Sequence, residues 1–160
     1  MAPQQGPADD AAAALARGVT RLLSRMEFAC LSEFSLRSGR RADIAALNGK
    51  GRLLIVEIKS SLADFRADSK WLDYEAYCDA FYFAVAPHFP VDVLPEDRGL
   101  ILADRFDAEI VRPADEDRVR MSGARRSEIT RRFALTAARR LMTISQETDL
   151  QRARSAPHPH

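Results

Sequence analysis

The run Leu53-Leu54-Ile55-Val56 restricts the fold of this chain more than any other feature. Consecutive apolar residues without polar alternation are typical of a β-strand that is covered on both faces. Such strands occur in α/β proteins, in which helices pack on both sides of a sheet. The run continues into Glu57-Ile58-Lys59, so charged side chains are expected at the end of a buried strand. The sequence therefore predicts an α/β fold with a polar site at one end of a central strand.

The segment Asn48-Gly49-Lys50-Gly51, which precedes this run, predicts a tight β-hairpin turn. Glycine adopts positive φ angles without steric cost, and short hairpin connections need such angles. A three-residue connection pairs Asn48 with Arg52. Counting outward from this pair places Asp43 opposite Glu57. Carboxylates directly opposite each other, about 5 Å apart between Cβ atoms, destabilise a sheet unless a positive charge compensates them.

Two groups can supply that positive charge. Strand alternation places Lys59 on the same face as Glu57, so its ammonium group is the first. A divalent cation is the second, because Mg²⁺ binds one or two carboxylates with waters and phosphate oxygens, and the Ile58 carbonyl adds an oxygen donor. Such an ion would activate a water that Lys59 orients. The alternative is a solvated face with ordinary ion pairs, since Glu-x-Lys alone is a common spacing.

Hydrophobic periodicity and turn residues predict the other helices and strands. Helices are expected over residues 9–25, 62–78 and 124–147, and strands over residues 29–36, 40–47, 52–59, 81–86, 99–103 and 108–112. The last helix is expected to bury Ile129, Phe133, Ala137, Leu141 and Ile144. This order predicts a mixed central sheet flanked by helices, with an α-β-β-β-α-β core, a hairpin and a final helix. We expect a single domain over residues 9–151, a disordered tail at 1–8 and a flexible tail at 152–160.

The charge distribution is uneven, although the net charge is only +1. Residues 118–154 carry ten arginines against three acidic residues, a net charge of +7, which leaves −6 for the rest of the chain. A basic helix beside an acidic body is compatible with binding to the DNA backbone, because neutralised phosphates release counterions. An arginine-rich solvated face explains this feature equally well.

The sequence also limits the environment of the protein. No apolar run approaches the length of about twenty residues that a membrane-spanning helix requires, and the first residues lack the layout of a secretion signal. Cys30 and Cys78 are too few and too far apart for a disulfide framework or a zinc site. We therefore expect a cytoplasmic protein with reduced cysteines and no contact with membranes.

The residues around the two acids resemble a known signature. Arg41-Ala42-Asp43, a glycine-containing turn and Val56-Glu57-Ile58-Lys59 resemble the PD-(D/E)xK motif of restriction-endonuclease-like nucleases, with Ala42 in place of the usual proline. The segments SGRRADIAAL and GLILADRFDAEIVR are similar to the bacterial MmcB-type DNA repair family, a resemblance that extends from about Leu15 to Leu141. It implies a restriction-endonuclease-like fold in which Asp43 and Glu57 hold Mg²⁺ or Mn²⁺. Lys59 would then assist the attacking water, with DNA as substrate and DNA repair proteins as partners.

Further candidates lie near this motif. Glu33 is a candidate additional acid, because related nucleases often carry a glutamate one element before the metal-binding aspartate; an exposed strand residue is as good an interpretation. Arg40 and Arg41 flank the site, where they either contact DNA or balance nearby acids.

Other candidates lie on the two helices that follow. Lys70, Tyr74 and Tyr77 share one face at α-helical spacing, similar to the QxxxY element of some PD-(D/E)xK branches, and would contact phosphate and bases. Packing at the edge of the core explains the tyrosines equally well. Asp64, Asp68 and Asp73 on the same predicted helix are either an extension of the metal site or, as we expect, solvated surface residues. Arg131 and Arg132 are the basic-helix residues that we expect to bind DNA.

These observations support two hypotheses of different classes. The first is metal-dependent hydrolysis of DNA phosphodiester bonds in repair, by an endonuclease. The second is a catalytically silent nuclease fold that binds DNA or docks a partner. The acids at positions 43 and 57 favour the enzyme, because they repel phosphate and have no use in a binding module. The sequence leaves RNA open as a substrate and does not determine the oligomeric state.

Overall fold

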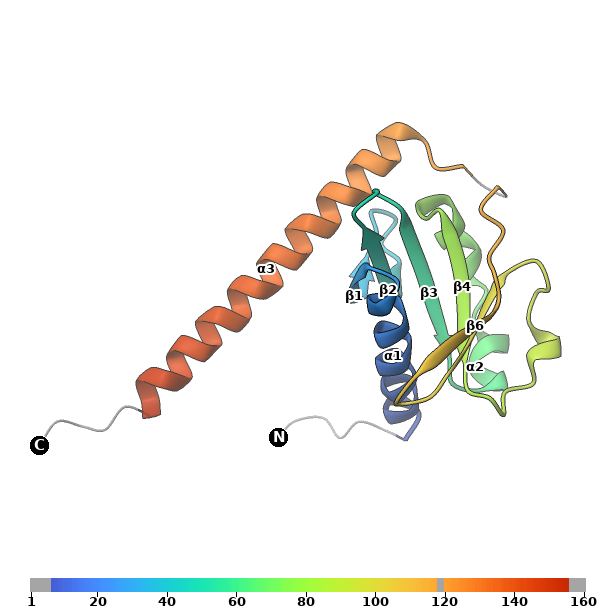
Figure 1. Ribbon diagram of the computed structural model, residues 1–160, viewed down its shortest axis with the longest axis horizontal. Helices are drawn as coiled ribbons and strands as arrows, with labels where there is room; N and C mark the ends of the chain where they lie inside the picture. The colour runs from blue at the N-terminus through green and yellow to red at the C-terminus, as the bar shows by residue number, and fades with distance from the viewer. Residues whose placement is uncertain (1–6, 118–119, 156–160) are drawn as a thin grey trace, which may run out of the picture.

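A mixed β-sheet forms the centre of the molecule, and helices cover both of its faces (Figure 1). The structure, a computed structural model, describes residues 7–117 and 120–155. The elements of these residues follow the predicted order, which confirms the α/β class. They are α1 (Pro7–Arg25), β1 (Phe28–Ser35), β2 (Arg41–Asn48), β3 (Leu53–Lys59), α2 (Leu62–Ala67), the 3₁₀ helix η1 (Lys70–Tyr77), β4 (Ala80–Val85), the 3₁₀ turn η2 (Val91–Val93), β5 (Gly99–Ala103), β6 (Ala108–Arg112) and α3 (Gly123–Ser155).

The strands lie side by side in sequence order, from β1 to β6. β3 pairs antiparallel with β2 and parallel with β4, so a hairpin leads into it and the helical segments α2 and η1 lead away. All seven residues of β3 are buried, as its apolar run predicts. Ile44 lies opposite Val56 and Leu47 opposite Leu53, which confirms the predicted register.

Asn48 fixes this register by closing the β2–β3 turn. Its backbone N–H donates to the Arg52 carbonyl at 3.1 Å. Its Oδ1 accepts the N–H groups of Lys50 and Arg52, each at 3.0 Å. Gly51 in the turn has a φ of 76°, a conformation that residues with a Cβ atom rarely adopt. The turn therefore determines which residues of the two strands face each other.

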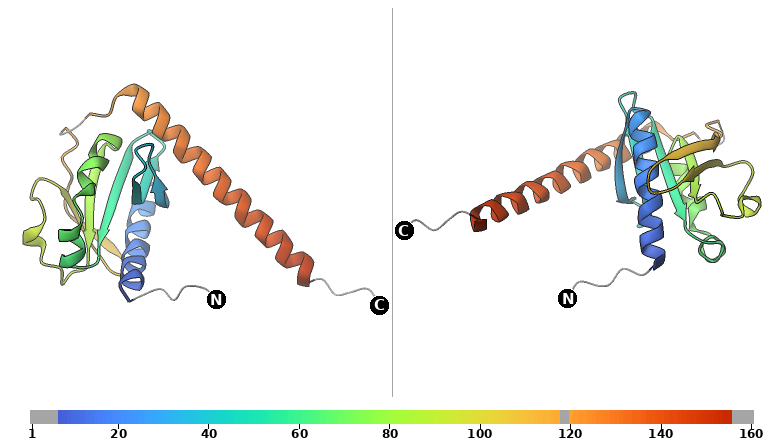
Figure 2. Two further views of the ribbon diagram at one scale, coloured as in Figure 1. Left: turned by 180° about the vertical axis from the view of Figure 1, so that it is seen from behind. Right: turned by 60° about the horizontal axis from the view of Figure 1, so that its bottom comes forward.

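Two hydrophobic layers enclose the sheet. On one face, α1 packs Leu15, Val19 and Leu23 against the strands. On the other face, Trp71 of η1 contacts the rings of Phe81 and Phe83 in β4, and the first turns of α3 join the same layer. Views from the front and from behind show α1 and α2 on opposite faces (Figures 1 and 2).

The single helix predicted over residues 62–78 is interrupted. α2 ends at Ala67, and the 3₁₀ helix η1 begins at Lys70. Asp68 lies at the interruption, where its Oδ1 accepts the backbone N–H of Lys70 at 2.8 Å. Short polar side chains that bind nearby backbone groups compete in this way with helical hydrogen bonds. The apolar spacing that predicts a continuous helix here contains no information about this competition, so the interruption was not predicted.

α3 extends far beyond the body of the protein (Figures 1 and 2). Ile129 and Phe133 are buried as predicted, and Ala137 is partly buried. Leu141 and Ile144 are 65% and 59% exposed, so the prediction that they belong to the core is wrong. The periodic pattern identifies an apolar helical face, but it does not reveal where the body beneath that face ends.

Helical structure extends further than predicted at both ends of the chain. α1 begins at Pro7 rather than at Asp9. α3 continues to Ser155, so residues 152–155 of the predicted C-terminal tail are helical. The other residues of the predicted tails, 1–6 and 156–160, lie outside the described residues.

No helix within residues 7–117 and 120–155 combines the length and apolar content needed to cross a bilayer. Cys30 and Cys78 are free thiols, as predicted. Burial raises the pKa of Cys30 to about 11, so its reactive thiolate is a minor species at neutral pH.

Candidate active site

Asp43 and Glu57 meet where the β2–β3 ladder ends. The last ladder pair is Ile44–Val56. Beyond it, Oε1 of Glu57 accepts the backbone N–H of Asp43 at 3.2 Å, and Oδ2 of Asp43 accepts the N–H of Ile58 at 2.8 Å. The two side chains thus converge, and they replace main-chain acceptors that the ladder no longer supplies.

Both acids are shifted toward their protonated forms. Burial, followed by the charge of Asp43, raises the pKa of Glu57 to about 8. Burial also raises the pKa of Asp43, against the hydrogen bond from Ile58 and the charge of Lys59, which lower it. Two carboxylates this close and this poorly hydrated do not readily ionise together. The pair therefore favours either a retained proton or a bound cation.

Lys59 is 3% exposed, and its ammonium group is paired with Asp68. Nζ of Lys59 donates to Oδ2 of Asp68 at 2.6 Å. Burial is the largest single influence on the pKa of Asp68 and raises it. The hydrogen bonds from Lys59 and Lys70 and the charges of these two lysines together outweigh burial and hold that pKa below its usual value. Asp64 accepts the backbone N–H of Ser60 at 3.2 Å. The expectation that Asp64 and Asp68 are only solvated residues is therefore wrong. Their four-residue spacing directly after β3 is the sequence signal that both lie on the side of the helix that faces the site.

An open cleft of about 960 Å³ extends from the acid pair between α1 and α2. This volume lies within the range of ligand-binding pockets. α1 contributes mostly alanines, which leave space beside the strand ends, and acidic side chains outnumber basic ones in the lining. The cleft is lined by Asp9, Ala12, Ala13, Ala16, Ser32, Glu33, Arg41, Asp43, Glu57, Ile58, Lys59, Ser60, Ser61, Asp64, Ala67, Asp68, Lys70 and Tyr74.

The donor set at the acid pair fits a hard divalent cation. The N–H and C=O groups of a strand residue point the same way, so the Ile58 carbonyl is directed to the side of Asp43. With Asp43 and Glu57 it offers oxygen donors only, which Mg²⁺ prefers. No group of three His, Cys, Asp or Glu side chains within residues 7–117 and 120–155 is arranged to hold a metal. Waters or substrate phosphate would have to complete the shell of an ion bound by two acids.

Glu33 and Arg41 lie at the rim of the cleft. Oε2 of Glu33 is 3.1 Å from Nη1 of Arg41, and both side chains are more than half exposed. Glu33 has a φ of 50°, in the left-handed region that residues other than glycine rarely adopt. Arg140 of α3 donates to the carbonyls of Ser32 at 2.6 Å and Glu33 at 3.0 Å, which anchors this strained segment.

The candidates on η1 do not share one face. A 3₁₀ helix has three residues per turn, so Trp71, Tyr74 and Tyr77 point together into the core, whereas Lys70 is exposed at the cleft. The prediction of a common face assumed α-helical spacing and is wrong. Tyr74 lines the cleft and donates its hydroxyl proton to the Arg41 carbonyl at 2.9 Å. Tyr77 lies outside the cleft lining.

The remaining predicted DNA contacts lie away from the acid pair. Arg40 forms an ion pair with an exposed aspartate of η1 at 2.9 Å and does not line the cleft. Arg132 is held by Glu128, one helical turn earlier, at 2.9 Å. Arg131 is exposed, and helical geometry directs it about 200° around α3 from the buried Phe133. The structure does not bring these arginines to the cleft.

Fold and site together define the class: an α/β protein with a mixed sheet, whose central strand ends in a buried acid pair that opens on a cleft. The chain belongs to the family described as DNA repair protein MmcB-like, which it matches over residues 2–148. It is also similar to a solved structure, a protein of unknown function from Silicibacter pomeroyi, with 41% identity and a TM-score of 0.82. That similarity covers 91% of this chain and 95% of the other. No curated protein matches the chain.

Family membership confirms the MmcB-type resemblance and associates the chain with DNA repair. It names no reaction, because the description of the family mentions neither a nuclease nor a metal.

Proposed function

We propose that the protein hydrolyses phosphodiester bonds of DNA during repair, with Mg²⁺ or Mn²⁺ held by Asp43, Glu57 and the Ile58 carbonyl. The observation that carries this proposal is the buried acid pair itself. Burial raises the pKa of each acid, and the charge of Asp43 raises that of Glu57 further, which is unfavourable for a site with a purely structural role. A function that needs both carboxylates accounts for this arrangement.

Each side chain has a task in this proposal. Asp43 and Glu57 would hold the ion, and a bound divalent ion would polarise the phosphate and lower the pKa of the attacking water. Lys59 uses one of its three donors for Asp68 and has the others for a water or a phosphate oxygen. Glu33 and Arg41, which pair at the rim of the cleft, would contact the DNA strand that enters it.

Two further points support this proposal. The family is associated with DNA repair, which makes DNA the expected substrate. The spacing of Asp43, Glu57 and Lys59 resembles the PD-(D/E)xK motif, and the β2–β3 register brings the first two side chains together as that motif requires.

The test is a cleavage assay on labelled single-stranded, duplex, nicked and branched DNA, with Mg²⁺, Mn²⁺ or EDTA. We expect cleavage that depends on the metal. Asp43→Asn and Glu57→Gln keep a hydrogen-bond acceptor for the backbone but lose the negative charge, and they should reduce the rate at least about a hundredfold. Lys59→Met should reduce it about ten- to a hundredfold.

Glu109→Gln on β6 and Asp115→Asn are the matched controls, because both residues lie outside the cleft lining. Both should cleave at the wild-type rate. Cleavage that persists undiminished in the Asp43 and Glu57 variants would mean that another site, or a contaminant, is responsible.

A catalytically silent DNA-binding module is the second candidate, and one observation favours it. The ammonium group of Lys59 is bound to Asp68 and is almost completely buried, which leaves it less available to a water than an unpaired lysine would be. A protein that binds DNA in a salt-dependent way but cuts none of these substrates with either metal would favour this candidate.

A further inference from the structure

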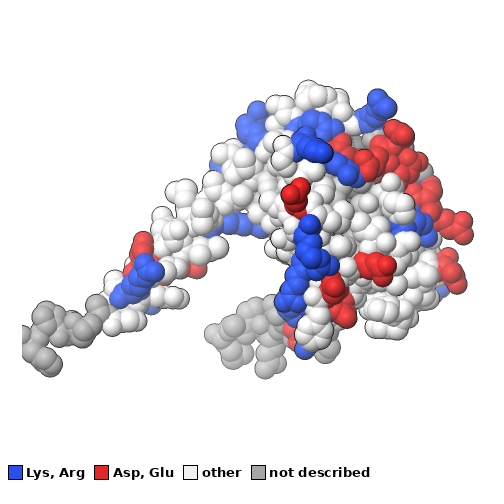
Figure 3. Space-filling model, in the orientation of Figure 1, with Lys and Arg blue, Asp and Glu red and all other residues white. Residues whose placement is uncertain are grey.

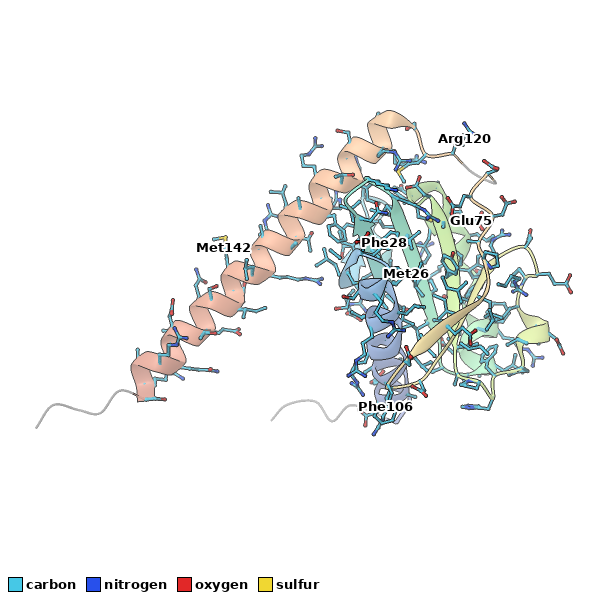
Figure 4. All side chains as sticks on the ribbon, viewed as in Figure 1. Met26, Phe28, Glu75, Phe106, Arg120 and Met142 are labelled. Carbon is cyan, nitrogen blue, oxygen red and sulfur yellow. The ribbon has the colours of Figure 1, made fainter. Side chains whose placement is uncertain are left out.

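Phe106, at the tip of the β5–β6 hairpin, is 68% exposed (Figure 4). It is the most exposed large hydrophobic side chain among residues 7–117 and 120–155. A phenyl ring in water forgoes the favourable free energy of burial, and Phe106 belongs to neither hydrophobic cluster of the described residues.

The backbone that presents this ring is held rigidly. Oδ1 of Asp104 accepts the N–H of Phe106 at 2.7 Å and that of Asp107 at 2.9 Å. The N–H of Asp104 in turn donates to the Asp107 carbonyl at 2.9 Å. Arg21 of α1 reaches across with Nη1 and donates to the carbonyls of Arg105 at 3.3 Å and Phe106 at 2.9 Å.

The hairpin also rests directly on the backbone of α1. A Cβ atom added to Gly18 would overlap with the carbonyl oxygens of Asp104 and Asp107, so only glycine permits this contact. Nη2 of Arg25 pairs with Oδ1 of Asp107 at 2.6 Å beside it. The exposed ring is therefore supported by an extensive set of contacts that fix its place relative to α1.

The ring lies among positive charges. Arg17, Arg21 and Arg25 follow one another at four-residue intervals along α1, and the guanidinium carbon of Arg105 lies 5.9 Å from the centre of the Phe106 ring. Figure 3 shows basic side chains in a column over α1. Arg17 and Arg105 make no ion pair within the described residues, so their charges are available to an anion.

This surface adjoins the cleft through α1. Ala13 and Ala16 line the cleft on one flank of the helix, and Gly18 meets the hairpin on the opposite flank. At 100° per residue, Arg17 and Arg21 lie between the two flanks, on the solvent side. A DNA strand that leaves the cleft across α1 would reach these arginines first and Phe106 next.

We infer that the Phe106 ring stacks on an unpaired DNA base while Arg105, Arg17 and Arg21 bind the adjacent phosphates. Aromatic rings stack on bases whose faces are accessible, which are bases outside a continuous duplex. A protein partner would be expected to bury a larger apolar patch, whereas here a single ring stands among arginines, which suits a polyanion with flat apolar bases. This inference rests on the proposed DNA substrate, and it specifies DNA with a single-stranded segment.

The test measures binding by fluorescence anisotropy in EDTA, so that it does not depend on cleavage. The probes are a single-stranded oligonucleotide, a duplex, and a duplex with a single-stranded flap. Phe106→Ala should weaken binding to the single strand and the flap at least about fivefold and change duplex binding less than about twofold. Phe106→Trp should restore the affinity, because it keeps a stacking surface. A 2-aminopurine base in the flap should lose fluorescence with the wild type but not with Phe106→Ala.

The slope of log affinity against log salt concentration reports the number of phosphate contacts. For single-strand binding, Arg105→Ala and Arg17→Ala should each lower this number by about one. Leu150→Ala, at an exposed apolar residue on the projecting part of α3, is the matched control and should bind as the wild type does. Equal affinity of wild type and Phe106→Ala for every probe would overturn the inference, and so would a wild type that binds none of the probes. Binding that depends on Phe106, with no cleavage under any metal, would contradict the proposed function alone. Cleavage without Phe106-dependent binding would contradict this inference alone.

Discussion

Glu57 is 4% exposed and carries a carboxyl group with a pKa of about 8, against an ordinary value of 4.5. Between these two pH values the folded protein binds a proton that the unfolded chain has released. The free energy of unfolding must therefore fall as the pH rises from about 5 to 8. Burial is the first cause of this effect and the charge of Asp43 the second. The same repulsion that weakens the fold is what a divalent cation would relieve.

Glu57→Gln should therefore stabilise the metal-free protein at alkaline pH. The amide keeps an oxygen for the backbone N–H of Asp43 and removes the charge. We expect the free energy of unfolding in urea with EDTA to rise by roughly 1–3 kcal/mol at pH 8.5 and by little at pH 5. Glu109→Gln on β6 controls for the substitution itself. A difference that is equal at both pH values would contradict the shifted pKa.

Divalent cations should stabilise the protein more as the pH rises. Binding of Mg²⁺ or Mn²⁺ requires ionised carboxylates, so protons compete with the metal at the raised pKa values of Asp43 and Glu57. We expect the increase in Tm caused by the metal to be larger at pH 8 than at pH 6, and to disappear when EDTA is added. Asp43→Asn should show no increase at either pH. A pH-independent increase in that variant would place the metal elsewhere.

Among the elements, α3 has two parts with different roles. Its first turns are fastened to the body: Arg126 forms a fork with Asp79, at 2.5 and 2.8 Å, and the ring of Phe133 lies 5.7 Å from that of Phe34. Its last anchor of this kind within the described residues is the pair of hydrogen bonds from Arg140 to β1. Beyond that residue the helix projects from the body (Figure 1).

Substitutions along α3 should reveal this division. Phe133→Ala removes a ring that is 6% exposed and should lower the free energy of unfolding by about 3–5 kcal/mol. Leu141→Ala changes a side chain that is 65% exposed and should cost less than about 0.5 kcal/mol. Urea unfolding monitored by circular dichroism measures both. A large loss for Leu141→Ala would show that another surface covers the projecting part in solution.

At the scale of the whole molecule, α3 determines the outline. A helix of 33 residues is about 50 Å long, and a compact chain of 160 residues has a radius of gyration of about 15 Å. We therefore expect small-angle X-ray scattering to give a radius of gyration clearly above about 15 Å. Deletion of residues 141–160 should bring it close to the compact value. An unchanged radius after deletion would mean that the helix folds back onto the body.

The sequence was most informative where local chemistry decides the structure. The turn after Asn48 and the apolar run before Glu57 suffice to predict the register and the meeting of the acids. The interruption at Asp68 and its pairing with Lys59 were not predictable from apolar spacing, because they depend on side-chain hydrogen bonds. The exposure of Leu141 was missed for another reason: a helical pattern describes one element and carries no information about the extent of its neighbours.

The hydrogen bonds between Asp43 and Glu57 link the completion of the sheet to the assembly of the site. Each carboxylate is oriented by a peptide group of the opposite strand, so the two side chains are immobilised when the hairpin closes. The conformational entropy of aligning the two carboxylates is thus lost once, during folding, and would not be lost again if a cation bound. A preorganised pair of this kind would bind its cation quickly and with little rearrangement of the chain.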